Sequence, residues 1–349
     1  MKAAVLHGID DIRYEEYETP ATLPGTIKVR VMAAGICGSD IPRVLQGKVK
    51  KFPLVLGHEF SGYVVEVGEG VTKFAVGDHV AGAPLLPCMN CPDCAHGNYS
   101  QCKQYSFVGS RVQGAFADYV VLPEKNAVKI DQALSFEQGA LFEPCTVGLH
   151  GVRLANFTGG KRVAVIGGGT IGFFTMQWAK IFGARQLVVF DINKDRLDFC
   201  KRCGATDGIC TLDEDYRDQA MALTEGNGFD YVFETCGVPA TIKMAMDLAA
   251  NKASVCYIGT PSKPVTFEPL EWENLNRKEL SVTGSWMSYS APFPGEEWVL
   301  TAHYFATGDL IYDPDAVYEK FPMNEASKAF ELYKTPGQVK GRVLLYNED

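Results

Sequence analysis

Residues 57–71 read Gly-His-Glu-Phe-Ser-Gly-Tyr-Val-Val-Glu-Val-Gly-Glu-Gly-Val, and upstream of them residues 35–40 read Gly-Ile-Cys-Gly-Ser-Asp. Cys37, His58 and Glu59 offer a thiol, an imidazole and a carboxylate, which zinc accepts as ligands. Catalytic zinc sites typically use three protein ligands and leave a further position open for water or substrate. The glycines predict tight turns between short apolar strands, whose ends can hold ligands rigidly. The stretch therefore predicts a β-rich domain with a metal site; the alternative is a buried histidine beside a structural cysteine.

A second group of cysteines lies in one short window and consists of Cys88, Cys91, Cys94 and Cys102. Four thiolates at this spacing can close a tetrahedral shell with no open position, which is typical of a structural zinc site. Closely spaced cysteines also hold iron–sulfur clusters, so that alternative stays open at this point. The prolines at positions 87 and 92 and the glycine at position 97 predict a loop rather than a helix over residues 88–102.

The overall composition limits the class of protein. The chain has 349 residues, of which 46% are hydrophobic and 21% are charged, and its formal net charge is -9. That length allows two domains, and that composition is typical of a globular protein. The negative charge and the lack of a basic stripe argue against a nucleic-acid partner. No apolar run reaches the length of a membrane span, and the first residues lack a signal peptide, so we expect a cytoplasmic protein with no membrane partner.

The first 130 residues are rich in short β-type runs that glycine and proline separate. These runs cover residues 2–6, 26–33, 62–67, 79–82, 117–122 and 127–130. Residues 135–154 read as helical, and Pro144 predicts a bend within them. Glu143 precedes that proline, so we expect its carboxylate to face a cavity and to need a partner there. A helix-end charge in solvent is the alternative for this glutamate.

A nucleotide-binding pattern begins near residue 161. The β-branched run 161–166 precedes the glycine-rich residues 167–172, and a helical pattern then extends to residue 182. In that context G-x-G-x-x-G predicts a turn whose backbone approaches a pyrophosphate at a helix N-terminus. Asp191 ends the next strand and can accept hydrogen bonds from ribose hydroxyls, which favours NAD over NADP; Arg196 would weaken its repulsion of a 2′-phosphate. The residues expected to contact the dinucleotide here are Gly167, Gly169, Thr170, Ile171, Gly172, Asp191 and Arg196.

The pattern Gly57-His58-Glu59-x-x-Gly62-x5-Gly68-x-x-Val71 resembles the signature of the zinc-containing alcohol dehydrogenases of the medium-chain dehydrogenase/reductase superfamily. The run Cys37-Gly38-Ser39-Asp40 matches the surroundings of that family's first metal ligand. The resemblance covers essentially the whole chain and implies an α/β protein. A GroES-like, β-rich catalytic domain would take residues 1–150 and 287–349, with a structural zinc lobe at residues 88–102. A Rossmann domain with a doubly wound parallel sheet would bind NAD and take residues 151–286.

The resemblance also implies a catalytic zinc, so that the chain would hold two zinc ions. A Glu-Pro pair marks the polyol-dehydrogenase branch of the family, which implies Cys37, His58 and Glu143 as ligands of this zinc. Glu59 would be an alternative ligand or a neighbour that tunes the metal. Many relatives have a cysteine as third ligand, but Cys145 lies two residues beyond the expected place.

Two further roles follow from the same resemblance. Ser39 would take the proton of the substrate hydroxyl, and Thr146 would approach the nicotinamide. Many relatives have a histidine as the next group of this proton relay. This chain has Pro42 at that position, so the outer part of the relay must use another group or water.

Segments 107–111 and 285–298 resemble those of polyol-phosphate dehydrogenases within this branch. The implied reaction is the oxidation of galactitol 1-phosphate to tagatose 6-phosphate by NAD. Arg43 and Arg111 are the candidate phosphate contacts, because arginine binds phosphate oxygens in a bidentate manner. Open alternatives are a free polyol such as sorbitol or xylitol, arabinitol phosphate, threonine, and a non-catalytic protein that binds zinc and NAD. Relatives of this branch imply a homodimer or homotetramer.

Overall fold

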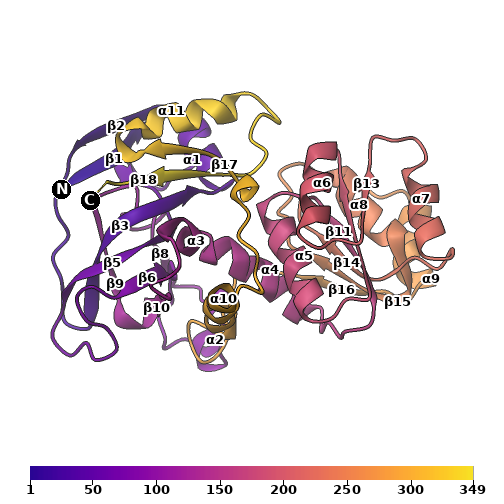
Figure 1. The fold of residues 1–349 in the computed structure, drawn as a ribbon, viewed down its shortest axis with the longest axis horizontal. Coiled ribbons are helices and arrows are strands. Elements are labelled where there is room, and N and C mark those ends of the chain that lie inside the picture. Colours follow the sequence, from indigo (N-terminus) through magenta and orange to yellow (C-terminus); the bar gives the residue numbers. More distant parts are fainter. Residues whose placement is uncertain (349) are drawn as a thin grey trace. The chain divides into compact units, whose positions relative to one another are not determined.

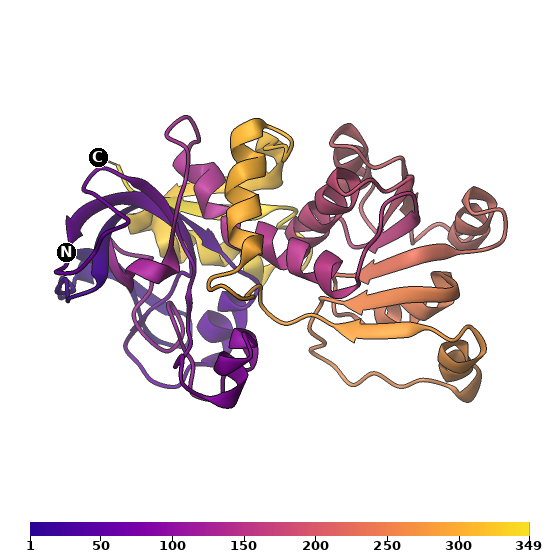
Figure 2. The ribbon, with the colours of Figure 1, turned by 90° about the horizontal axis from the view of Figure 1, so that it is seen from below.

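The computed structural model describes residues 1–348, which form two compact units (Figure 1). Unit 1 contains residues 1–143 and 289–348, and unit 2 contains Pro144–Ser288. The first strands of the chain, in indigo, and its last strands, in yellow, therefore belong to the same unit (Figure 2). Within residues 1–348, no helix combines the length and the hydrophobicity needed to cross a membrane.

Unit 1 is built mostly from β-strands. They are β1 (Lys2–Gly8), β2 (Asp11–Glu16), β3 (Thr26–Ile36), β4 (Leu54–Val55), β5 (Glu59–Val67), β6 (His79–Gly82), β7 (Leu85–Leu86), β8 (Ser106–Phe107), β9 (Tyr119–Pro123), β10 (Ala127–Lys129), β17 (Val317–Pro322) and β18 (Arg342–Tyr346). Its α-helices are α1 (Asp40–Gln46), α2 (Pro92–Ala95), α3 (Phe136–Ala140), α10 (Glu296–Thr307) and α11 (Ala326–Glu331). Short 3-10 helices cover Tyr99–Gln101, Glu124–Asn126, Pro314–Ala316, Met323–Glu325 and Leu332–Lys334.

The largest sheet of unit 1 has the strand order β10-β6-β5-β3-β18-β17, and β9 also pairs with β3. Strand β3 lies between β5 and β18 and is antiparallel to both, with Gly35 opposite Glu59 and Ile36 opposite Val343. In an antiparallel pair the end of one strand faces the start of the other. The residue that follows β3, the residue that precedes β5 and the first residue of β18 therefore meet at one edge of the sheet.

Hydrophobic alternation fixes which face of β3 is buried. Ile27, Val29 and Val31 are buried, whereas Lys28 and Arg30 between them are partly exposed. Successive side chains of a strand point to opposite faces, so this pattern turns one face of β3 toward the core of unit 1. A shift of the pairing by one residue would expose that face, which is why the register is firmly specified.

Unit 2 is a parallel α/β sheet with the strand order β13-β12-β11-β14-β15-β16, which confirms the doubly wound prediction. Its strands are β11 (Arg162–Ile166), β12 (Gln186–Asp191), β13 (Asp207–Cys210), β14 (Phe229–Glu234), β15 (Ala249–Tyr257) and β16 (Ser281–Gly284). Its helices are α5 (Thr170–Ile181), α6 (Lys194–Arg202), α7 (Tyr216–Leu223), α8 (Pro239–Leu248) and α9 (Pro269–Arg277). The strand order reverses between β11 and β14, where such sheets bind their ligands.

The helical stretch predicted over residues 135–154 contains a break. Helix α3 ends at Ala140, Leu141 follows it, and α4 covers Phe142–Leu154. Pro144 is the third residue of α4, and a proline is tolerated there because the first turn of a helix has no intrahelical acceptors for its N–H groups. Glu143 therefore lies in the first turn of α4, next to the break.

We expect Gly62→Ala to weaken the pairing of β3 with β5. A methyl group on Gly62 would overlap the carbonyl oxygen of Arg30 on β3, which cannot move without shifting the ladder. We expect the free energy of unfolding to fall by about 1–3 kcal/mol, as for other overpacked cores. Urea unfolding measures the change. Gly284→Ala is the control, since its new methyl group would meet no atom within 4 Å. Equal stability of both variants would contradict the tight β3–β5 contact.

Candidate functional site

The structure brings together ligand atoms of Cys37, His58 and Glu59, which all lie within 4.8 Å of one another. We name these three residues the Cys-His-Glu cluster. Cys37 directly follows β3, His58 directly precedes β5, and Glu59 begins β5. The antiparallel register of β3 and β5 is therefore the reason why residues far apart in the sequence become neighbours.

The donor atoms of this cluster fit a metal cation. Glu59 is fully buried, and among residues 1–348 neither of its carboxylate oxygens has a hydrogen-bond partner. The Nδ1 atom of buried His58 also lacks one. A buried carboxylate without hydrogen bonds is costly, and a cation bound by the thiol, the imidazole and a carboxylate would offset that cost.

Asp40 connects the cluster to helix α1. Its buried carboxylate accepts a hydrogen bond from the backbone N–H of Cys37 at 3.1 Å. Its Oδ1 atom lies 3.6 Å from Nδ1 of His58 and 2.7 Å from Nη1 of Arg43. Groups behind metal ligands commonly fix the orientation of those ligands. Asp40 is placed to do so for Cys37, and its negative charge lies near the His58 imidazole.

Arg342 supplies a buried positive charge beside the cluster. It begins β18, and its Nη1 atom donates a hydrogen bond to the carbonyl oxygen of Ile36 at 2.9 Å. Its Nε atom lies 3.0 Å from Oε2 of Glu59, an ion pair without hydrogen-bond geometry. Burial is the largest single effect and works to lower the pKa of Arg342, but Glu59, Cys37, Tyr333 and Glu143 together outweigh it, so the pKa is raised. The arginine therefore stays charged and offsets part of the negative charge of the cluster.

Burial also acts on the acidic groups of this region. It raises the pKa of the Cys37 thiol, and the charge of Glu59 raises that pKa further. It raises the pKa of the Glu143 carboxyl to about 7, again with a contribution from Glu59. The charges of Glu59 and His58 reach Glu143, so this glutamate lies near the cluster. A bound cation would reverse the effect, because it favours deprotonated ligands. Whether Glu143 or Glu59 is the third ligand stays a prediction.

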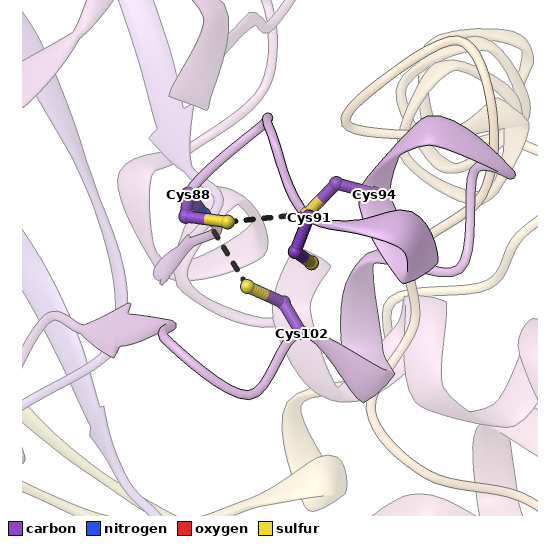
Figure 3. A group of neighbouring side chains, drawn as sticks. All are labelled: Cys88, Cys91, Cys94 and Cys102. Atoms are coloured by element: carbon purple, nitrogen blue, oxygen red, sulfur yellow. Dashed lines mark hydrogen bonds between the residues drawn. The ribbon is translucent and has the colours of Figure 1, made fainter.

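The four cysteines predicted as a structural site converge in a lobe of unit 1 (Figure 3). The sulfur atoms of Cys88, Cys91, Cys94 and Cys102 all lie within 4.8 Å of one another. The sulfurs of Cys88 and Cys94 are 4.0 Å apart. A tetrahedral zinc with Zn–S bonds of about 2.3 Å has sulfur–sulfur edges of about 3.8 Å, so the spacing fits zinc. Backbone N–H groups, first that of Asn90, lower the pKa of Cys88 to about 7, which favours its thiolate.

The glycine-rich turn of unit 2 lies between β11 and α5. Gly167 has a φ of +98°, which favours glycine, and Gly169 is the N-cap residue of α5. Helix α5 begins at Thr170, so Thr170, Ile171 and Gly172 form its first turn. The N–H groups of a first turn lack intrahelical partners and can bind a phosphate.

Asp191 and Arg196 both contact the glycine-rich turn. Asp191 ends β12, and its Oδ2 atom accepts a hydrogen bond from the N–H of Gly168 at 2.6 Å. Arg196 is buried, and its Nε and Nη2 atoms donate to the carbonyl oxygen of Gly168 at 3.0 and 2.5 Å. Arg196 was predicted to contact the nucleotide. In the structure its guanidinium group binds the carbonyl oxygen of Gly168 and so supports the backbone of the turn.

The remaining predicted residues have these positions. Ser39 precedes α1 and is exposed, and Thr146 is buried in α4, where its hydroxyl donates to Ser288 at 2.7 Å. Arg43 lies on α1, and its Nη1 atom donates to Ser39 and Asp40. Arg111 donates to the carbonyl oxygen of Tyr105, and its guanidinium group lies 3.6 Å from the centre of the Tyr105 ring.

The loop that carries Arg111 packs against the Cys-His-Glu cluster. The ring of Phe107 contacts the His58 imidazole edge to face, with ring centres 5.5 Å apart. The backbone N–H of Arg111 donates to the carbonyl oxygen of Phe107 at 2.9 Å. Gly109 in the same loop lies so close to Gly57 that a methyl group would overlap the Gly57 carbonyl. Arg111 therefore comes from a loop in direct contact with a candidate metal ligand.

The sequence analysis missed the contributions of Asp40 and Arg342. Asp40 is only three residues after Cys37, so its position in the sequence could have predicted a contact with the first ligand. Arg342 comes from the far end of the chain, and only the pairing of β18 with β3 reveals its place beside Glu59.

Comparison with known proteins identifies two families of domain in the chain. Residues 23–132 match the alcohol dehydrogenase GroES-like domain, and residues 170–300 match the zinc-binding dehydrogenase domain. The first match contains the Cys-His-Glu cluster and the four-cysteine lobe, and the second begins at the first residue of α5. Both matches agree with the fold predicted from the sequence.

Whole-chain comparisons find dehydrogenases. Galactitol 1-phosphate 5-dehydrogenase of Escherichia coli is 38% identical over 82% of this chain and 83% of its own length. The crystal structure of galactitol-1-phosphate dehydrogenase from Escherichia coli covers 99% of this chain and 100% of its own, with a TM-score of 0.94 and 35% identity. Sorbitol dehydrogenase of Bacillus subtilis is 34% identical over 90% and 89% of the two chains. A zinc-binding dehydrogenase from Sinorhizobium meliloti, bound to NADP, has a TM-score of 0.89 and 30% identity over 99% and 98%.

We expect Arg196→Met to weaken the binding of NADH and NADPH by a similar factor of about 10. The variant loses two charge-assisted hydrogen bonds that support Gly168, so either nucleotide would meet a less ordered turn. Fluorescence titration of both nucleotides measures the change. Lys201→Met on the same helix, an exposed lysine, is the control and should leave both affinities unchanged. A loss confined to NADPH would instead indicate a direct contact of Arg196 with the 2′-phosphate.

Proposed function

The chain belongs to the zinc-binding alcohol dehydrogenase family, and we propose on that premise that it oxidises galactitol 1-phosphate to tagatose 6-phosphate with NAD as the hydride acceptor. The family itself acts on CH–OH groups. The observation that carries the choice of a phosphorylated substrate is Arg111, which has no carboxylate partner among residues 1–348 and belongs to the loop that packs against His58.

We assign the catalytic zinc to Cys37, His58 and Glu143, with Glu59 as an alternative ligand or a neighbour of the metal. The Glu59 oxygens, which accept no hydrogen bond within residues 1–348, and the nearness of Glu143 support both possibilities. Bound zinc supplies Lewis acidity, which lowers the pKa of a substrate hydroxyl. Ser39 takes the proton of that hydroxyl and passes it toward solvent, to which it is exposed.

We assign the pyrophosphate of NAD to the turn formed by Gly167, Gly169 and the first residues of α5. Bound there, NAD would supply the acceptor for the hydride of the substrate carbon. The carboxylate of Asp191 accepts hydrogen bonds from the adenosine ribose and repels a 2′-phosphate. Arg196 weakens that repulsion in part, because its charge lies at the same glycine-rich turn, where it binds the carbonyl oxygen of Gly168. Thr146 approaches the nicotinamide.

The phosphate of the substrate fits Arg111 better than Arg43. The guanidinium group of Arg43 is already paired with the buried carboxylate of Asp40 at 2.7 Å. Arg111 contacts a neutral carbonyl and an aromatic ring, and among residues 1–348 no carboxylate lies within 4.0 Å of it. An uncompensated guanidinium group can bind a phosphate without first breaking an ion pair.

A free polyol is the second candidate substrate. The similarity to sorbitol dehydrogenase of Bacillus subtilis, at 34% identity over most of both chains, favours it. Such a substrate would use the same metal site and the same hydride transfer. It would leave Arg111 without a function in substrate binding.

We infer a homodimer or homotetramer in the cytoplasm. Strand β16 ends the parallel sheet of unit 2, and Val282 on it is 43% exposed, so its edge can pair with a second copy of the chain. None of the eleven cysteines forms a disulfide within residues 1–348, which suits a reducing compartment.

Steady-state kinetics with purified protein tests the substrate. We expect kcat/KM for galactitol 1-phosphate to exceed that for galactitol and sorbitol by at least about 10-fold, because one charge-assisted phosphate contact is worth about 1.5–3 kcal/mol. NAD should be preferred over NADP. Turnover of free polyols at equal or higher efficiency would favour the second candidate. Absence of NADH formation from all three compounds in zinc-loaded protein would contradict the proposal.

Metal analysis tests the assignment of two zinc ions. We expect two zinc ions per chain in the native protein and one in each of Cys37→Ala and Cys94→Ala. The Cys37 variant should lose turnover while the four-cysteine lobe still holds its metal. The Cys94 variant should melt at a lower temperature. Cys203→Ala, which removes a buried thiol outside both sites, is the control. Iron in place of zinc would contradict the assignment of the lobe.

A further inference from the structure

Residues 289–294 read Tyr-Ser-Ala-Pro-Phe-Pro and lead into helix α10 of unit 1. We name them the aromatic segment. The ring of Phe293 is stacked on that of Tyr289, with ring centres 5.7 Å apart and an interplanar angle of 7°. Tyr289 is only 4% exposed, so the stack belongs to the interior of unit 1. A stacked pair of this kind keeps its two side chains in a fixed relation.

The four-cysteine lobe contacts the aromatic segment at two places. The rings of Tyr99 and Phe293 meet edge to face, with ring centres 5.2 Å apart. A methyl group on Gly97 would lie 2.8 Å from the Cβ atom of Ala291, so the two backbones are in close contact. Both lobe residues lie in the stretch 94–102, which begins and ends at a lobe cysteine. A metal bound by those cysteines would therefore also fix the surface against which Phe293 packs.

The other end of the segment holds strand β7. The hydroxyl oxygen of Tyr289 accepts a hydrogen bond from the backbone N–H of Leu85 at 2.9 Å, and both residues are buried. The carbonyl oxygen of Leu85 accepts a hydrogen bond from the side-chain amide of Asn126 at 2.6 Å. A buried N–H group that loses its acceptor is costly, so the Tyr289 hydroxyl fixes the position of this short strand.

Strand β7 in turn supports the Cys-His-Glu cluster. It forms a two-stranded sheet with β8, in which Leu85 lies opposite Phe107. The ring of Phe107 contacts the His58 imidazole, with ring centres 5.5 Å apart. The carbonyl oxygen of Phe107 also accepts the backbone N–H of Arg111. A displacement of β7 would therefore move the ring against which His58 packs. The contacts run without a break from the four-cysteine lobe to a candidate metal ligand.

We propose that the aromatic segment is a clamp through which the four-cysteine lobe positions His58, with Tyr289 as its central positioning residue. Tyr289 acts through β7 and Phe107 and contacts neither metal nor substrate in this role. The lobe then does more than stabilise its own fold, because a metal bound there strengthens metal binding at the Cys-His-Glu cluster. Such coupling is reciprocal, so each metal favours the other. The inference rests on the proposed function, which assigns a metal to each site.

The zinc affinity of Tyr289→Phe tests the clamp. The variant keeps the stacked ring and loses only the acceptor of the Leu85 N–H group. We expect the Cys-His-Glu cluster to bind zinc about 10-fold more weakly, because removal of a group that supports a metal ligand typically has an effect of that size. Competition with dipicolinate, followed by zinc analysis, measures the affinity. An unchanged affinity would overturn the inference.

Tyr231→Phe is the matched control. It also removes a tyrosine hydroxyl that bonds to the backbone, here the carbonyl oxygen of Asn156 in unit 2. Its zinc affinity should equal that of the native protein. In the cobalt-substituted protein, the visible absorption of the ion at the Cys-His-Glu cluster should change with Tyr289→Phe and stay unchanged with Tyr231→Phe. A loss of the same size in both tyrosine variants would overturn the inference, because it would indicate general destabilisation.

Two backgrounds locate the effect. In Cys37→Ala, which keeps only the zinc of the lobe, the added Tyr289→Phe change should leave zinc binding unchanged. In Cys94→Ala, which keeps only the zinc of the cluster, it should weaken binding by less than about twofold, because the clamp has already lost its metal-bound end. The full loss of about 10-fold in the Cys94→Ala background would overturn the function of the lobe in the clamp.

A double-mutant cycle with Phe107→Leu tests the path to His58 while the lobe stays intact. If Tyr289 acts through Phe107, zinc binding by the double variant should match that of Phe107→Leu to within about twofold. Two losses that multiply would overturn the inference. These measurements need no substrate. If the native protein oxidises no polyol, the proposed reaction fails and the zinc affinities still decide the inference, whereas a Cys-His-Glu cluster that binds no zinc would overturn both.

Discussion

The candidate metal site depends on the register of three antiparallel strands. Gly35 on β3 lies opposite Glu59 on β5, and Ile36 lies opposite Val343 on β18. This register alone brings the thiol of Cys37, the imidazole of His58 and the guanidinium group of Arg342 to one sheet edge. A slip by one residue would turn every side chain of a strand to its other face, so the hydrophobic alternation that buries β3 also fixes the chemistry of the site.

Charge balance is the second constraint. The region holds the buried carboxylates of Asp40 and Glu59 and, next to them, Glu143, whose pKa is raised to about 7. Arg342 offsets part of this negative charge, and Arg43 pairs with Asp40. The carboxylate oxygens of Glu59 accept no hydrogen bond within residues 1–348, so they can bind one more cation. The two arginines thus have separate functions. Arg342 on β18 offsets the negative charge of Glu59, whereas Arg43 on α1 contacts both Asp40 and the hydroxyl of Ser39.

The sequence predicted those parts of the sites that are formed by residues close together in the chain. The four cysteines, the glycine-rich turn before α5 and the pairing of thiol with imidazole follow from local residue types and from the resemblance they support. Contacts between distant strands could not be predicted in this way. The ion pair of Arg342 with Glu59 is an example, because it depends on the pairing of β18 with β3. Side-chain contacts could not be predicted either: the hydrogen bonds of the Arg196 guanidinium group to the carbonyl oxygen of Gly168 appear only in the structure, and its contact with the nucleotide stays a prediction. The break before Glu143 was predicted at Pro144, but it falls at Leu141 because a proline fits the first turn of α4.

The central claim is that strand register builds a metal site from Cys37, His58 and a nearby glutamate. The most direct test is anomalous X-ray diffraction at the zinc absorption edge from crystals of the zinc-loaded protein. We predict two anomalous peaks per chain, one inside the four-cysteine lobe and one within about 2.0–2.3 Å of Cys37, His58 and a carboxylate of Glu143 or Glu59. A peak in the four-cysteine lobe alone, with Cys37 and His58 fully ordered and no metal between them, would contradict the account.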